Sequence, residues 1–362
     1  MAPGTGSAAA RLVVTVEPAP PDGWAALLAD DPEATFFHTP LWSDALVRHA
    51  GGVTPLWFVA REAGRCLGGL SAVARRRGPL RLLQSHFDGT AGGPLVAPDL
   101  PEETRDAVAA ALLAAWARAA RRPDVAAASL ILSTGADARW GDRLARAGWR
   151  RRDLPYAAIP LAGGPEAVAY GVLPKNRRNE RNRALRRGCT AGVTDAAAVL
   201  AEYYPIYLAA ARRWGVSPTP EALLRELLAR GGGAAFLSWV RRDGRLIGGH
   251  VCFRHGAEVV AWNGATLPEH AEVFPATLLV WTDIVEACRG GAQRLDLGGS
   301  GGVAGVARFK ELLGARFALR GRWETASPPY RLWRRLRAGR RRATTQPAGG
   351  GAAGAVGNGG TA

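Results

Sequence analysis

Cysteine is scarce in this sequence of 362 residues, and its placement is uninformative for metals. The four cysteines, Cys66, Cys189, Cys252 and Cys288, lie far apart, and no Cys-x-x-Cys pair occurs. Closely spaced cysteines mark zinc sites and the disulfide frameworks of small secreted proteins. The sequence therefore predicts no metal site and favours a reducing compartment.

Long apolar runs are also missing, and so are the marks of export. The N-terminal stretch has no positively charged segment followed by a long apolar one, and no run approaches the roughly 18 apolar residues of a membrane span. We expect a cytoplasmic protein. The 48% hydrophobic content still suffices for a substantial core, and the length suggests two domains or one large one.

Acidic residues are too few to balance the basic ones, which gives a net charge of +16. Most of this excess lies in two segments, residues 175–187 with +6 and residues 330–342 with +7, so the remaining chain carries only +3. Concentrated positive charge favours anionic partners such as a phosphate-bearing substrate, tRNA or an acidic membrane surface. The alternative is a solvated basic face.

Residues 293–316 contain the most informative pattern, QRLDLGGSGGVAGVARFKELLGAR. Residues 294–297 alternate polar and apolar side chains as a strand does, and five glycines follow between 298 and 305. Glycine lets backbone amides approach a ligand closely, so Gly298, Gly299 and Ser300 are candidate binding residues for an anion or an oxyanion. A short helix carrying Phe309 and Lys310 is expected next.

Catalytic triads and nucleophile–base pairs are absent from the sequence pattern, which excludes an obvious acyl-enzyme chemistry. Transfer of an acyl group by direct attack needs a neutral amine, a positioned carbonyl and donors for the developing negative charge. His250, on an expected strand, is a candidate base, with a buried structural histidine as the alternative. Asp296 is a candidate polar organiser and a weaker candidate base.

Two further stretches carry candidate binding residues. The segment LPKNRRNERNRALRRG reads as a helix with basic side chains around most of its circumference, and its candidates are Arg177, Arg178 and Arg181. The segment HFDGTAGGP places His86, Asp88 and Gly93 in one loop. An Asp-Gly pair of this kind is also typical of a simple turn.

These motifs together resemble the Fem-type aminoacyltransferases and the cellulose-biosynthesis acetyltransferase-like proteins of the GNAT superfamily. The resemblance rests on the Asp-x-Gly, glycine loop and Phe-Lys order, on HTPLW at residues 38–42, where Trp42 is expected in the core, on the basic helix, and on Trp262 and Trp281. It runs from about residue 36 to 323. Gly92-Gly93-Pro94 stands where many members have Arg-Gly-Pro, and Ala97 stands where the peptide-bridge branch has aspartate, which favours a different acceptor.

The resemblance implies an α/β (α+β) protein with two tandem GNAT-like domains, each a mixed sheet flanked by helices. We expect these domains at residues 11–161 and 165–328, with residues 1–10 disordered and residues 329–362 forming a basic, then disordered tail. It also implies that Lys310 stabilises the oxyanion, that Phe309 contacts the adenosine of the donor, and that the basic helix meets phosphates.

The implied activity is N-acyl transfer to an amine of a cell-envelope precursor or polysaccharide. Ordinary GNAT acetyltransferases bind the CoA pyrophosphate with a Gln/Arg-x-x-Gly-x-Gly/Ala turn at a helix start, and no such turn follows either expected sheet, which leaves aminoacyl-tRNA and acyl-CoA open as donors. The donor would be a co-substrate, with no permanently bound cofactor. Two alternatives remain: a non-catalytic protein that binds RNA or the inner membrane surface, and an acetyltransferase for small amines or protein N-termini.

Overall fold

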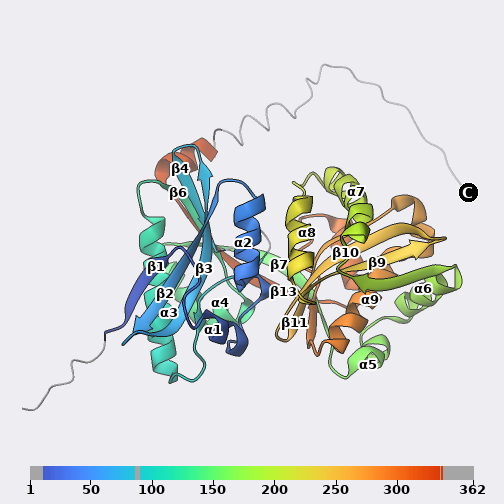
Figure 1. The fold of residues 1–362 in the computed structure, drawn as a ribbon, viewed down its shortest axis with the longest axis horizontal. Helices are drawn as coiled ribbons and strands as arrows, with labels where there is room; N and C mark the ends of the chain where they lie inside the picture. The colour runs from blue at the N-terminus through green and yellow to red at the C-terminus, as the bar shows by residue number, and fades with distance from the viewer. Residues whose placement is uncertain (1–10, 86–89, 335, 337–362) are drawn as a thin grey trace, which may run out of the picture.

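The computed structural model describes residues 11–85, 90–334 and 336, and Figure 1 shows their arrangement. Two halves lie side by side, each with helices packed on strands. The N-terminal half contains these elements: β1 (Val13–Glu17), α1 (Trp24–Asp30), η1 (Phe36–His38), α2 (Pro40–His49), β2 (Val53–Glu62), β3 (Arg65–Arg77), β4 (Leu80–Gln84), β5 (Leu95–Val96), α3 (Glu102–Ala120), β6 (Val125–Ile131), α4 (Thr134–Arg146) and β7 (Arg150–Pro160).

The C-terminal half follows with a helical corner and a second set of strands. Its elements are α5 (Gly164–Gly171), α6 (Lys175–Arg186), β8 (Cys189–Thr194), α7 (Ala197–Trp214), α8 (Glu221–Arg230), β9 (Ala235–Arg242), β10 (Arg245–His255), β11 (Glu258–Thr266), η2 (Pro268–Val273), α9 (Pro275–Arg289), β12 (Arg294–Asp296), α10 (Ala304–Leu312) and β13 (Arg316–Ala326).

The strands of both halves join into one mixed sheet with the order β1-β2-β3-β4-β6-β13-β7-β12-β11-β10-β9-β8. The last strand, β13, lies between β6 and β7 and is antiparallel to both. On its other side β7 pairs with β12. The last strand of the N-terminal half, β7, thus pairs with β12 and β13, which come from the end of the chain. The domain boundary at residues 162–165 stays a prediction, because the sheet runs continuously past it.

One hydrophobic core is shared by the two halves. Phe36, Phe37 and Trp42, from the HTPLW region, are buried together with side chains of α7, α8 and β10. Phe36 stacks on Phe253 of β10 with ring centroids 4.4 Å apart. Aromatic side chains bury large areas, so these contacts fix how the halves sit relative to each other. Trp42 is fully buried, in agreement with its expected place in the core.

The expectation of a mixed α/β fold is confirmed. The basic helix forms as α6, the expected strand of His250 as β10, the strand before the glycines as β12, and the helix with Phe309 and Lys310 as α10. The sequence patterns did not reveal α1, α5, β4 and β8, which are short. In the described part of the chain, no helix is both long and apolar enough to cross a bilayer.

Candidate functional site

The glycine loop joins β12 to α10 beyond the point where β11 and β12 pair in parallel. This pairing covers only three residue pairs and ends at Asp296. Gly298, Gly301 and Gly302 have φ values of +70°, +57° and +81°, a region where a side chain is strained. The sequence needs glycine at these positions because the chain turns from a strand into a helix within a few residues.

Lys310 anchors this loop from inside. Its Nζ donates to the backbone carbonyls of Leu297, Gly298 and Gly299 at 2.7, 2.9 and 2.8 Å. An ammonium group has three N–H donors, and all three are used here. The side chain is buried and burial lowers the pKa of Lys310 to about 8, although Asp296 opposes that shift. With its three N–H groups on these carbonyls, Lys310 would act on an oxyanion through the loop that it holds, and its implied role in stabilising the oxyanion stays a prediction.

The carbonyl contacts of Lys310 fix the direction of the neighbouring amides. In a trans peptide the N–H points opposite to the carbonyl of the preceding residue. The amides of Gly298, Gly299 and Ser300 therefore point away from the lysine. The Gly298 amide donates to Asp296 Oδ1 at 2.6 Å. Among the described residues, the amides of Gly299 and Ser300 have no acceptor, so they form a pair of free donors suited to an oxyanion.

Asp296 is buried at the start of the loop and holds it through hydrogen bonds. Its carboxylate is fully buried, and its Oδ2 accepts from Arg320 at 2.6 Å. The guanidinium carbon Cζ of Arg320 lies 4.0 Å from the centroid of the Tyr156 ring. Burial lowers the pKa of Arg320, but Asp296 and Glu258 more than offset this, and its pKa is raised. With both oxygens engaged inside the protein, Asp296 positions the loop.

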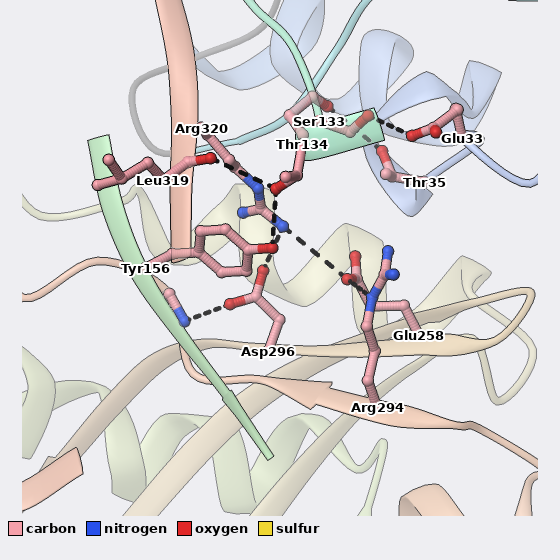
Figure 2. A network of polar contacts seen from close by, with 12 residues as sticks. Glu33, Thr35, Ser133, Thr134, Tyr156, Glu258, Arg294, Asp296, Leu319 and Arg320 are labelled. Carbon is pink, nitrogen blue, oxygen red and sulfur yellow. Dashed lines mark hydrogen bonds and ion pairs between the residues drawn. The ribbon is translucent and has the colours of Figure 1, made fainter. Parts of the chain in front are cut away.

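Figure 2 shows how this network reaches from one half to the other. Tyr156 Oη lies 3.1 Å from Thr134 Oγ1 at the start of α4, and Glu258 Oε2 accepts from Arg294 at 2.5 Å. A cavity of about 230 Å³ lies beside Glu258 and Arg294, and its other wall is the end of α1. The glycine loop is thus tied by ion pairs to a hollow between the two halves.

His250 lies on the face of β10 that α9 covers, where it pairs with Asp283. His250 Nδ1 donates to Asp283 Oδ2 at 2.7 Å, and Asp283 is fully buried. Cys252 Sγ lies 3.4 Å from the other carboxylate oxygen. The carboxylate orients the imidazole so that Nε2 is the free nitrogen, the arrangement that a general base requires. The ring is 13% exposed and faces Gly264 of β11, where a side chain would collide with it.

The ligand atoms of His250, Cys252 and Asp283 lie within 4.8 Å of one another, a grouping that the sequence did not reveal. Burial raises the pKa of the Cys252 thiol well above its usual range, and nearby Asp283 raises it further. The thiol donates to Asp283 Oδ1, the carboxylate that also accepts from His250. We interpret this cluster as a hydrogen-bonded support for His250.

The three arginines selected on α6 have structural partners. Arg177 contacts Glu180 at 2.6 Å, and Arg178 donates to the carbonyls of Ala169 and Leu173 at the end of α5. The Arg181 guanidinium stacks on Trp281 of α9 at 4.4 Å. Arg178 and Arg181 attach α6 to the end of α5 and to α9, whereas Arg177 pairs within α6 itself.

Other cations of this segment are the exposed ones, and sequence reasoning missed the distinction. They are Lys175, Arg183, Arg186 and Arg187. Helical spacing alone could not separate the two groups, because basic residues surround the helix. The partners of the half-buried arginines, Trp281 and the carbonyls at the end of α5, lie on other elements, so the pattern of α6 alone does not show them.

The remaining candidates are spread over the structure. Phe309 is half-buried on α10 and packs against the core under α9, where Trp281 also packs. Gly93 is buried with φ +129°, and a side chain there would meet Leu132. Its backbone interacts with His38, and burial lowers the pKa of His38 to about 3. His86 and Asp88 lie outside the described residues.

Comparisons with known proteins agree with this architecture. Residues 174–311 match the family model described as "Acetyltransferase (GNAT) domain". No curated protein sequence matches the chain. In structure the chain is similar to FemX, at 13% identity and a TM-score of 0.69, over 85% of this chain and 96% of that one.

Two further structures are similar at lower scores. A tandem GNAT protein from the clavulanic acid biosynthesis pathway has 18% identity and a TM-score of 0.53, over 87% of this chain and 98% of that one. A C-terminal domain of a putative lysylphosphatidylglycerol synthetase from Agrobacterium fabrum has 13% identity and a TM-score of 0.51, over 74% and 83%. At such identities the likeness shows the fold, and it confirms the predicted tandem architecture.

Proposed function

We propose that this chain, whose residues 174–311 match a GNAT acetyltransferase family model, transfers an acyl or aminoacyl group by direct attack of an amine on the donor carbonyl. The acceptor amine belongs to a cell-envelope precursor or polysaccharide. The observation that carries the proposal is the pair of free amides of Gly299 and Ser300, fixed by Lys310 from the opposite side of the loop. Preorganised donors of this kind stabilise the charge that develops on the carbonyl oxygen.

The remaining chemistry falls to other residues of the C-terminal half. The His250 Nε2 takes the proton of the attacking amine, with Asp283 holding the ring in the required tautomer. Phe309 provides an apolar surface for the donor beside the loop. The exposed cations of α6 bind phosphates of the donor or the acceptor. No step requires an acyl-enzyme, because the amine attacks the bound carbonyl.

The donor divides into two chemical classes, a thioester and an aminoacyl ester of tRNA. A GNAT domain implies acyl-CoA as co-substrate, which supports the thioester. The Fem-type motifs and the likeness to FemX support the tRNA ester. The positive charge of +16 suits either polyanion.

A transfer assay with the purified full chain tests both donors. Acetyl-CoA and charged tRNA are offered in parallel with amino sugars and with amine-bearing peptidoglycan precursors, at two salt concentrations. Lys310→Met is compared with Arg308→Met, a matched exposed position on the same helix. We expect turnover with one donor, a loss of about 10²-fold in Lys310→Met, because the amides of Gly299 and Ser300 lose the side chain that orients them, and no change in Arg308→Met.

The outcomes separate the possibilities. Turnover of charged tRNA assigns the aminoacyl branch, and turnover of acetyl-CoA with small amines alone assigns the small-amine alternative. Equal activity of Lys310→Met and wild type would contradict the role of the glycine loop. Absence of transfer with every donor and acceptor, in folded protein, would contradict the proposed reaction.

A further inference from the structure

The chain continues past β13 into a helical segment, residues 328–334, that places large apolar side chains in solvent. Leu332, Trp333 and Leu336 are 59%, 47% and 61% exposed. Tyr330 stacks on Trp333 with centroids 5.4 Å apart. Trp333 and Leu336 are three residues apart, which puts them on one side of a helix. Arg331 and Arg334 are exposed on the same segment.

This segment lies at one end of the sheet, where three other basic turns meet. The Ser327 amide donates to the carbonyl of Ala126 at the start of β6, and β4 starts beside the same point. Figure 1 shows the red helical segment next to the labels of β4 and β6. The β3–β4 turn and the start of β7 lie at this end too, as the pairings of Arg77 with Leu80 and Arg150 with Glu324 require.

Exposed arginines from four separate segments therefore lie at the same end of the sheet as these apolar side chains. They are Arg76, Arg77, Arg121, Arg122, Arg150, Arg331 and Arg334. The nearest acid of the β6 turn, Asp124, is bridged by Arg81 and by Arg122, the latter at 3.3 Å. The Arg81 hydrogen bond lowers the pKa of Asp124. The sequence adds five more arginines between residues 335 and 342.

A surface that combines arginine with exposed tryptophan and leucine has the chemistry of a bilayer interface. Anionic headgroups attract the arginines, and the boundary between headgroups and acyl chains accepts the apolar side chains. Nucleic acid would satisfy the arginines and stack on Trp333, but it offers no apolar environment for Leu332 and Leu336. The observations thus favour lipid over RNA.

We propose that this end of the protein, defined by residues 76–77, 121–122, 150, 328–334 and 336, docks on an anionic phospholipid surface. The contact is peripheral: the segment lies along the interface with its apolar side chains inserted. This surface is separate from the glycine loop and from the ion-pair network around Asp296. The proposal therefore does not depend on which donor the enzyme uses.

Cosedimentation of the full chain with vesicles tests the proposal. Vesicles of phosphatidylglycerol and phosphatidylcholine are compared with vesicles of phosphatidylcholine alone, at low and physiological salt. We expect binding to the anionic vesicles only. The double variant Trp333→Ala, Leu336→Ala loses most of this binding, at low and high salt alike. The double variant Arg331→Ala, Arg334→Ala weakens it at least tenfold, since one such charge contributes about fivefold, equivalent to roughly 1 kcal/mol.

Matched control variants remove side chains of the same kind from another part of the surface. Leu185→Ala with Val216→Ala removes two side chains that are also about half exposed, and Arg212→Ala with Arg213→Ala removes two exposed arginines of α7. These variants should bind vesicles like wild type. No binding of wild type to anionic vesicles would overturn the proposal. Vesicle binding that persists in the double variant Trp333→Ala, Leu336→Ala would also overturn it. So would a short RNA that binds through Trp333 and displaces the protein from the vesicles.

Discussion

Arg320 and Asp296 form an ion pair at 2.6 Å that joins β13 to β12 across the intervening strand β7. The Asp296 carboxylate has no solvent exposure, and its second oxygen accepts the Gly298 amide. The strand that closes the N-terminal sheet is thereby connected to the first residue of the glycine loop. Substitution of either residue should therefore lower the stability of the sheet and alter the conformation of the glycine loop.

Replacement of one partner of this pair should be far more damaging than replacement of both. Arg320→Met leaves the Asp296 carboxylate buried without its cation, and we expect unfolding free energy to fall by about 3–5 kcal/mol. The double variant Arg320→Met, Asp296→Asn should recover part of that loss. Urea denaturation with a double-mutant cycle measures the coupling. If the two single losses simply add, the ion pair does not act as a unit.

Titration of Lys310 should give the enzyme a pH limit. Burial lowers the pKa of Lys310 from 10.5 to about 8, so above that pH the ammonium that binds the carbonyls of Leu297, Gly298 and Gly299 is lost. We expect kcat to fall as pH rises through about 8. Between about 8 and 10.5 the unfolded chain binds more protons at this group than the folded one. This group alone therefore makes stability rise with pH there.

The check is a pH profile of kcat together with thermal denaturation from pH 7 to 10. In Lys310→Met the residual activity should lack the limb near pH 8, and its stability should lose the corresponding rise. Arg308→Met serves as the control with both features intact. A limb that persists unchanged in Lys310→Met would assign the titration to another group.

A base role for His250 predicts a distinct signature. His250→Asn should reduce kcat by about 10²–10⁴-fold, the usual contribution of general acid–base catalysis. Asp283→Asn removes the carboxylate that orients the ring and should reduce kcat less than His250→Asn does. Cys252→Ala, which removes only the thiol that donates to the same carboxylate, should reduce kcat less than Asp283→Asn does. Full activity in His250→Asn would mean that the amine arrives neutral or loses its proton to solvent.

The overall architecture follows from patterns that are local in the sequence. The strand before the glycines, the proline-initiated α9 and the alanine-rich α3 were predictable, because alternation, helix starts and helix ends are read from neighbouring residues. The order of strands was not. Placement of β13 between β6 and β7 depends on pairing between residues that lie far apart in the chain.

The candidate site shows the same division. The glycine loop and Lys310 were identified from residue type and spacing, but the direction of the lysine toward three carbonyls depends on the folded loop. Asp283 was missed as the partner of His250, since 33 residues separate them and no motif links them. Arg320 was missed for the same reason. The exposed arginines of α6 could not be separated from the half-buried ones before Trp281 and α5 were in place.

The two groups of arginines on α6 should respond oppositely to substitution. Arg178 donates to two carbonyls of α5, so Arg178→Ala should lower the unfolding free energy by about 2–3 kcal/mol, because buried acceptors lose a charged donor. Arg183→Ala and Arg186→Ala, at exposed positions, should leave stability within about 0.5 kcal/mol. If α6 meets a polyanionic donor, each of these two variants should instead reduce the slope of log affinity against log salt by about one. Thermal denaturation and donor titration at several salt concentrations separate the two effects. An unchanged salt slope in the Arg183→Ala, Arg186→Ala double variant would remove α6 from the donor site.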